Sequence, residues 1–521
     1  MLKIQNIYLS MVALILISSC GWAPAPRNPV NEIATSIHPP AQFPFTNNNC
    51  QHPEANLNLG PNNSLGQIKL FELYESEIQE IKVLLNDTRM EKSLISPIVG
   101  STIYNPAYEK FCGQFGSIDF NEGFSRIQCP NNPGFSQTNK GQNLRVCKKD
   151  IELKRDSVES AALSSIHKLN QAYEFFQYAT KKQLRKIKLE IFPEYSLIFK
   201  RLDEFGMEVS SPIRVYYVRN MVYWPGWDTI SVFPEDADTY NDARENERQY
   251  PYLWESTFVL GHELGHHIQF NIAPKIKYCP AAKWNSLKHQ FESVEDKNIK
   301  INPPAGINER LAKICSSITE AFADLFSNYH EQGAATSISG LPGFYPTRSP
   351  ERSAFSDGTP KQLNQTVLTI YLEKADTITT PPNIKIDFRD THMIGAILAY
   401  NINRFFKIIQ DANRDFFRDD QNVEDPNDPE DRFTKAYTYR MKWLELFMEY
   451  FKDKNPPMLG DEAPYDLYFR PIIEALEYTL NDAIVQARIP VSQLNALKTK
   501  ICKASKEGLS ITLPLYMNTC R

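Results

Sequence analysis

The chain lacks several features that would assign it to common classes. Its nine cysteines include no C-x-x-C pair, which argues against a cysteine-based zinc site or redox motif. The formal net charge is only -5 and no basic patch stands out, so no nucleic-acid partner is expected. The apolar run at residues 7–17 is too short to span a bilayer comfortably. What remains is a 521-residue chain, 42% hydrophobic, that is long enough for two or three domains.

The first twenty residues read as a targeting segment. Lys3 precedes the apolar run, which ends in Ile17-Ser18-Ser19-Cys20-Gly21. This resembles the lipobox of bacterial lipoproteins, which implies removal of residues 1–20 and a lipid on Cys20 as a membrane anchor. Gly21 in place of Asp then implies export to the outer membrane. Ordinary cleavage nearby and an uncleaved anchor are the alternatives.

Without Cys20 the chain keeps an even number of cysteines, as an exported protein with disulfides would. Spacing suggests the pairs Cys502–Cys520 and Cys279–Cys315, with the other four paired among themselves. Residues 21–49 are rich in Pro and Asn and are expected to form a tether. Residues 50–150 are expected to form a disulfide-rich N-terminal module, followed by a catalytic half at 151–330 and a mostly helical lobe at 331–521.

Hydrophobic periodicity predicts the elements of these parts. The expected helices are Ile68–Leu85, Asp156–Thr180, Leu311–Tyr329, Thr391–Ile409, Phe433–Phe451, Tyr468–Gln486 and Val491–Lys506. The expected strands are Ile187–Phe192, Ile213–Val222 and Asp228–Phe233.

The strongest motif is His262-Glu263-x-x-His266, in an apolar segment that ends at Pro274. Positions i and i+4 share a helix face, so both imidazoles can bind one metal ion. Glu263 lies beside them, where it can accept a proton from water.

A catalytic zinc needs a third protein ligand. No histidine occurs from Ile268 to Lys288, so the H-x-x-G-x-x-H continuation of metzincins is absent. Glu320 and Asp324 are i and i+4 on the next predicted helix, among apolar residues. That placement suggests Glu320 as ligand and Asp324 as acceptor from a ligand imidazole. Glu309 is the competing third ligand.

His262-Glu263-x-x-His266 with Glu320-x-x-x-Asp324 resembles the gluzincin pattern of zinc peptidases. The resemblance implies an α+β zincin catalytic domain with one Zn²⁺, acting on protein or peptide substrates. In that fold a twisted sheet with an edge strand, expected here at Trp227–Phe233, accompanies the active-site helix. An interior hairpin strand is the alternative for that segment.

The segment around His392 resembles the thermolysin-like region that supplies an oxyanion donor. This implies His392 as the donor, oriented by Asp390 or Asp387. The alternative is a surface histidine beside a capping Asp390.

Two acidic stretches, Pro234–Pro251 and Arg414–Asp431, resemble calcium loops only in composition, and solvated loops explain them as well. The rivals to the peptidase are an inactive zincin-fold envelope lipoprotein that acts as a binding or scaffold protein, and an exported scaffold with structural zinc.

Overall fold

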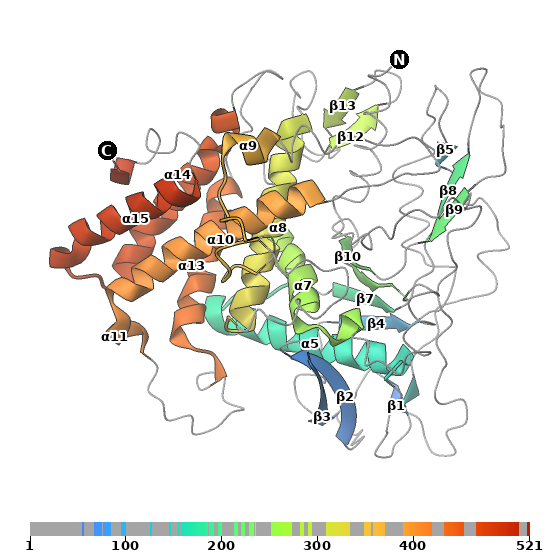
Figure 1. The fold of residues 1–521 in the computed structure, drawn as a ribbon. Helices are drawn as coiled ribbons and strands as arrows, with labels where there is room; N and C mark the ends of the chain where they lie inside the picture. Colours follow the sequence, from blue (N-terminus) through green and yellow to red (C-terminus); the bar gives the residue numbers. More distant parts are fainter. Residues whose placement is uncertain are drawn as a thin grey trace, which may run out of the picture.

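The computed structural model of the chain is shown in Figure 1. It describes residues 55–56, 67–74, 77–84, 95–99, 126–127, 145–146, 155–156, 158–185, 187–191, 196–200, 213–216, 220–224, 229–233, 235, 252–273, 282–285, 290–293, 309–333, 349–355, 358–369, 389–418, 432–452, 465–509 and 518–520. The predicted lipobox with Cys20, the tether, and most of the N-terminal module and of the two acidic stretches lie outside these residues.

A mixed four-stranded sheet lies beside the motif helix. Its strand order is β10 (Met221–Trp224), β11 (Thr229–Val232), β7 (Ile187–Ile191) and β4 (Ile95–Val99). Strands β11, β7 and β4 run parallel, whereas β10 is antiparallel to β11. All four residues of β11 are buried, as in a strand that is covered on both faces.

The remaining described strands form small sheets. They are β1 (Ala55–Asn56) with β6 (Arg145–Val146), β2 (Gln67–Tyr74) with β3 (Glu77–Leu84), β5 (Arg126–Ile127) with β8 (Ser196–Lys200) and β9 (Ile213–Tyr216), and β12 (Ala282–Asn285) with β13 (Gln290–Ser293).

The helix predicted at Ile68–Leu85 is wrong, because this segment forms the β2–β3 hairpin. In its register Leu70 faces Ile81 and Ile68 faces Val83. Apolar residues that can line one side of a helix can equally pair across two strands, and a short window does not separate the two periods.

The prediction of the edge strand is also wrong. β11, which lies within the predicted edge Trp227–Phe233, pairs on both sides and is interior, and β10 is an edge of the described sheet. The predicted strand Ile213–Val222 is split, since β9 pairs in one sheet and β10 begins in another. Sequence alternation marks a strand but carries no information on its partners.

Helix α5 (Val158–Thr180) supports the sheet and the motif helix together. The face predicted to be apolar is buried along its length: Ala162, Ile166, Leu169, Ala172 and Phe176. Each large side chain buried in this way contributes about 1.5–3 kcal/mol to folding.

The motif lies on α7 (Thr257–Ile272), which follows the short helix η1 (Leu253–Glu255). Ser256 caps α7, and its hydroxyl accepts a hydrogen bond from the Val259 N–H at 3.2 Å. Arg155 donates twice to the buried Glu255 carboxylate, at 2.5 and 2.6 Å. These contacts join the start of α7 to the residues just before α5. They fix the place in the fold where the motif helix begins.

Helix α8 (Glu309–His330) packs between α7 and α10 (Arg389–Ala412). The short helices α9 (Gln365–Leu368) and α11 (Arg414–Phe417) flank α10 in the sequence. Figure 1 shows the three long helices α7, α8 and α10 between the four-stranded sheet and the C-terminal helices.

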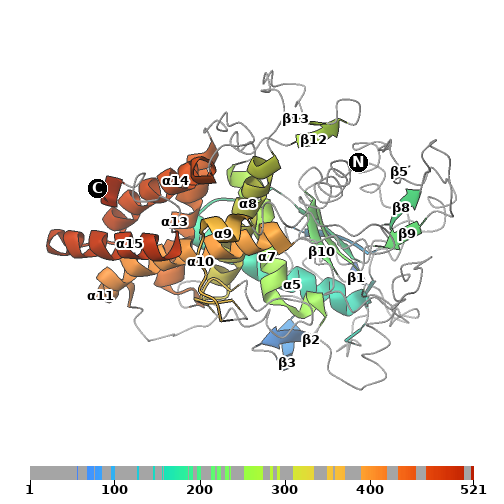
Figure 2. The ribbon, with the colours of Figure 1, turned by 45° about the horizontal axis from the view of Figure 1, so that its top comes forward.

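The helices predicted in the C-terminal part of the chain are present among the described residues. This part contains α13 (Lys435–Lys452), α14 (Tyr465–Gln486), η4 (Val491–Gln493), α15 (Leu494–Gly508) and η6 (Asn518–Cys520). Figure 2 shows these helices gathered on one side of α8 and α10. The predicted disulfide Cys502–Cys520 is present and ties η6 to α15. Cys315 is also disulfide-bonded, but its predicted partner Cys279 lies outside the described residues.

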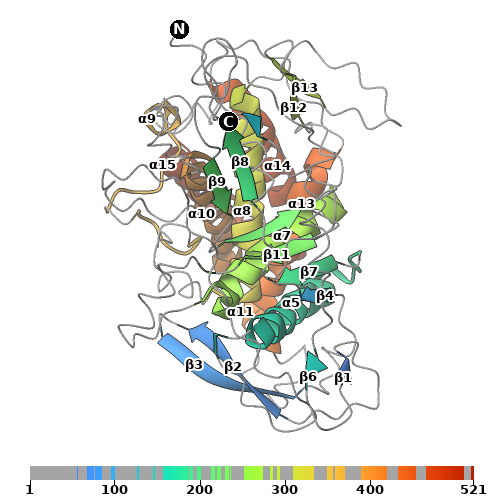
Figure 3. The ribbon, with the colours of Figure 1, turned by 90° about the vertical axis from the view of Figure 1, so that its right-hand side faces the viewer.

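The view in Figure 3 places α5 and α7 next to β7 and β11, with α8 running behind them. Among the described residues, no helix has the length and apolar character needed to cross a membrane.

Candidate metal centre

The close approach of α7 and α8 depends on small residues. A Cβ on Gly265 would lie 2.8 Å from the Ala323 Cα, and one on Gly261 would lie 2.7 Å from the Ser327 Oγ. The Ser327 hydroxyl donates to the Phe258 carbonyl oxygen at 2.7 Å and locks the two helices together. The glycine before each motif histidine therefore lets the neighbouring helix reach the imidazoles.

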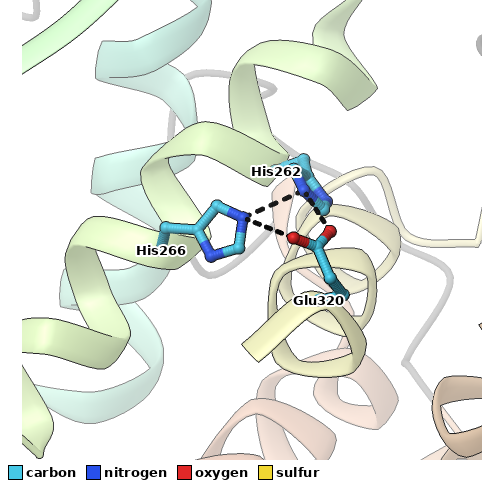
Figure 4. A group of neighbouring side chains, drawn as sticks. All are labelled: His262, His266 and Glu320. Atoms are coloured by element: carbon cyan, nitrogen blue, oxygen red, sulfur yellow. Dashed lines mark hydrogen bonds and ion pairs between the residues drawn. The ribbon is translucent and has the colours of Figure 1, made fainter. Parts of the chain in front are cut away.

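His262, His266 and Glu320 meet at this contact (Figure 4). The Nε2 atoms of the two histidines are 3.1 Å apart. Glu320 Oε2 lies 3.3 Å from the Nε2 of His262, and Glu320 Oε1 lies 3.7 Å from the Nε2 of His266. All three residues are buried, and one ligand atom from each lies within 4.8 Å of the others. The group can hold a metal ion.

The triangle can be compared with ideal coordination. Ligand bonds of about 2.0–2.1 Å at tetrahedral angles place the ligand atoms about 3.3 Å apart. The three observed separations scatter around this value. The side chains thus fit one small ion without a rearrangement of the helices.

Glu320 rather than Glu309 completes this group. Both lie on α8, which begins at Glu309. They are eleven residues apart on that helix, which corresponds to about 16 Å along its axis. One helix therefore cannot bring both carboxylates to the same two histidines.

The Glu320 carboxylate lies among three imidazoles. Its Oε2 is also 3.4 Å from the Nε2 of His392 on α10. Burial would raise the pKa of the Glu320 carboxyl, but His392, His262 and His266 outweigh burial and lower this pKa well below its usual value. Glu320 is therefore ionised at neutral pH, as a metal ligand must be.

Asp324 lies one turn after Glu320, next to the first motif histidine. Its Oδ1 is 2.8 Å from the Nδ1 of His262, and its side chain is fully buried. An acid beside Nδ1 favours the tautomer that carries its proton there, which leaves the Nε2 of His262 available to a metal ion. The predicted role of Asp324, as acceptor from an imidazole that binds zinc, stays a prediction.

Glu263 of α7 is fully buried, and its carboxylate is held by strand β10. Its Oε2 accepts a hydrogen bond from the Tyr223 N–H of β10 at 2.8 Å. The Met221 N–H, which points the same way along the strand, is taken by the Asn220 side chain at 2.8 Å. These two outward donors of β10 are thus engaged within the protein.

The surroundings of His392 are described only in part. The histidine lies against Glu320, and Gly395, one turn further on, has room for no side chain because a Cβ there would lie 2.7 Å from the Glu320 Cβ. The side chains of Asp387 and Asp390 are outside the described residues, so their predicted orienting role has no structural counterpart here.

Sequence reasoning missed three residues that support the site. The Tyr223 hydroxyl lies 3.1 Å from the Nδ1 of His267, whose Nε2 lies 2.9 Å from the Arg185 carbonyl oxygen. The adjacent His267 could have been noticed as a third motif histidine with its own role.

Comparison of the chain with models of protein families, with curated proteins and with solved structures found no match.

Proposed function

We propose that the chain is a zinc-dependent hydrolase of peptide bonds with a zincin-type catalytic domain. The observation that carries the proposal is the buried triangle of His262, His266 and Glu320 with the Glu263 carboxylate on the same helix. Two imidazoles and one carboxylate are the protein ligands of many catalytic zinc sites, where three ligands leave a position open.

A zinc ion held by these residues would supply Lewis acidity, which polarises a substrate carbonyl and makes water acidic enough to attack at neutral pH. Glu263 is the proposed general base and general acid. Its carboxylate accepts a proton from the attacking water and then delivers it to the leaving amine. The Tyr223 N–H fixes one carboxylate oxygen, so the other is oriented for this transfer.

His392 is the proposed donor to the oxyanion that develops on the former carbonyl. It reaches the site from α10, on the Glu320 side of the triangle. An imidazole N–H in this position stabilises negative charge as it forms in the transition state. Polypeptide is the proposed substrate class, because β10, which contacts Glu263 through the Tyr223 N–H, is an edge of the sheet in the described residues, and an edge strand can pair with an extended chain.

Glu263→Gln tests this proposal, because it keeps the size of the side chain and removes the base. We expect wild type to hydrolyse an unfolded protein substrate, to lose activity with a chelator and to regain it with zinc. Glu263→Gln should keep bound zinc and lose at least about 100-fold in kcat. Unchanged hydrolysis in this variant would refute the role of Glu263, and wild type that binds zinc without hydrolysing peptides would refute the enzyme.

A further inference from the structure

We propose that Tyr223 and His267 form a positioning pair, which holds strand β10 against α7 so that the Tyr223 N–H keeps the Glu263 carboxylate in place for proton transfer. The inference rests on the proposed function and deepens it, because it gives the third histidine of the motif segment a role in the reaction. The pair acts by position, without a change of charge and without a bond to the metal.

Tyr223 is attached to α7 at two points. Its backbone N–H donates to Glu263 Oε2 at 2.8 Å, and its hydroxyl oxygen lies 3.1 Å from the Nδ1 of His267. Glu263 and His267 are four residues apart on α7, so they share one face of the helix. A single residue of β10 therefore spans one helical turn, which fixes the position of the strand along the helix and its rotation about it.

The hydrogen bonds of His267 have a consistent direction. Its Nε2 lies 2.9 Å from the Arg185 carbonyl oxygen, which can only accept, so Nε2 carries the ring proton. Nδ1 is then an acceptor, and the Tyr223 hydroxyl donates to it. The Asn271 side-chain nitrogen, 3.2 Å from Nε2, is a donor as well and instead donates to the His267 carbonyl oxygen at 2.7 Å. The ring is thus held in one orientation.

His267 also connects α7 to the first turn of chain that leads into β7. Arg185 precedes β7, and its N–H and Nε both donate to the Asn271 side-chain oxygen at 3.2 Å. In the sheet, β7 and β10 lie on either side of β11. His267 therefore bridges α7 to β10 and to the residues before β7, and both of its ring nitrogens have partners in these contacts.

Burial makes the contact between Tyr223 and His267 a firm one. Both residues are fully buried, and their rings meet edge-on with centroids 5.4 Å apart. The Tyr223 ring also lies 5.9 Å from that of Phe270, one turn further along α7. A buried hydrogen bond has no competition from solvent water, so it fixes geometry better than an exposed one.

Strand β10 needs such a contact because it is an edge of the described sheet and pairs only with β11 there. A strand with one partner is easier to shift than an interior strand. The Glu263 carboxylate belongs to α7, but its hydrogen-bond donor belongs to β10. Proton transfer requires heavy atoms about 2.6–3.2 Å apart, so a shifted β10 would move the base out of range.

Tyr223→Phe tests the pair, because it removes the hydroxyl and keeps the ring and the backbone N–H. We expect kcat on an unfolded protein substrate to fall about 10-fold, near the upper end of the effect of one hydrogen bond. A substrate chain can follow a shifted strand, whereas Glu263 cannot, so KM and bound zinc should stay within about two-fold of wild type. Tyr450→Phe is the matched control: it removes a hydroxyl that donates to Glu474 at 3.1 Å, away from the site, and should keep wild-type kcat.

Two substitutions of His267 separate positioning from filling of space. His267→Asn leaves an oxygen near the place of Nδ1 that can accept from Tyr223, whereas His267→Gln places its amide near Nε2 and loses that acceptor. We expect His267→Asn to keep more of the wild-type kcat than His267→Gln. If the imidazole only fills space, the order is reversed, because Gln replaces more of its volume. That reversed order, or equal kcat values, would overturn the inference.

Hydrogen exchange of the backbone amide at position 223 tests the pair without turnover. It is measured on the metal-free full chain, where we expect exchange about 10-fold faster in Tyr223→Phe and unchanged in Tyr450→Phe. A folded Tyr223→Phe protein with wild-type exchange or wild-type kcat would overturn the inference. Wild type that hydrolyses no peptide would refute the proposed function instead, and amide exchange then decides by itself whether the pair holds β10.

Discussion

His330, the last residue of α8, is a buried imidazole outside the candidate metal site. It stacks on Phe326, with ring centroids 6.3 Å apart, and meets Phe175 edge-on. Burial lowers the pKa of His330 to about 3, and the positive charge of Arg432 acts in the same direction. The histidine is therefore neutral in the folded protein at pH values where the unfolded chain binds a proton.

This difference predicts that acid destabilises the fold through His330. Between pH 6.5 and about 3 the unfolded chain holds the extra proton, so the free energy of unfolding decreases as the pH falls. From pH 7 to pH 4.5 the wild type should lose about 2–3 kcal/mol more than His330→Gln. Denaturant unfolding of both proteins at the two pH values measures this, and metal release by acid affects both equally. Equal losses would contradict a buried neutral His330.

Which site residues can be predicted depends on how they are connected. His262, His266 and Glu320 lie at helical spacings among apolar residues, and the structure brings them together as predicted. Tyr223 of β10 and Arg185, which precedes β7, contact the motif helix from distant parts of the sequence. Nothing local in a sequence encodes such a long-range approach, so these residues could not be identified before the fold was known.

Three helices meet at glycines around the candidate metal centre. Gly265 of α7 faces the backbone of Ala323, and Gly395 of α10 faces the Glu320 Cβ at 2.7 Å and the Ser317 carbonyl oxygen at 3.1 Å. Gly261 faces side chains and no backbone: a Cβ there would lie 2.7 Å from the Ser327 Oγ and 3.4 Å from the His330 Nδ1, and side chains move more easily than backbone. The same substitution at these positions should therefore have unequal effects.

We expect Gly265→Ala and Gly395→Ala to lower the free energy of unfolding by about 1–3 kcal/mol, because backbone or a metal ligand must move. Both should also weaken zinc binding, since Glu320 shifts relative to the histidines. Gly261→Ala is the matched control on α7, with the same gain in helix propensity and a smaller loss on both measures. Thermal unfolding and chelator competition measure the two effects. A Gly261→Ala protein that suffers more than Gly265→Ala would contradict the packing described here.

The long helices were predictable because each has a buried face repeated over several turns, as in α5 and α8. Short elements could not be predicted from periodicity in the same way. The apolar residues of 67–84 fit a helix and a hairpin alike, and the hairpin forms. The edge position of β10 depends on pairing with β11, which is a property of the assembled sheet.

The four-stranded sheet, the helices α7, α8 and α10, and the C-terminal helices share one hydrophobic core in the described residues. The predicted lipid anchor lies outside them, at Cys20. Whether Cys20 carries a lipid can be tested by expression of the whole chain in a bacterial host. We expect wild type to carry the mass of a lipid at Cys20 and to partition with membranes, and Cys20→Ser to lack both. Because Cys20 is not one of the proposed zinc ligands, Cys20→Ser should keep the zinc content of wild type. A wild-type chain that begins elsewhere and carries no lipid would contradict the anchor.

The zinc content of the purified full chain tests the account most directly, with Glu320→Gln and Glu309→Gln measured beside wild type. Both variants make the same substitution on α8, but only Glu320 belongs to the triangle with His262 and His266. We predict one zinc ion per chain in wild type and in Glu309→Gln, and loss of zinc from Glu320→Gln. Wild type without zinc, or a Glu320→Gln protein that retains it while Glu309→Gln loses it, would contradict the metal centre.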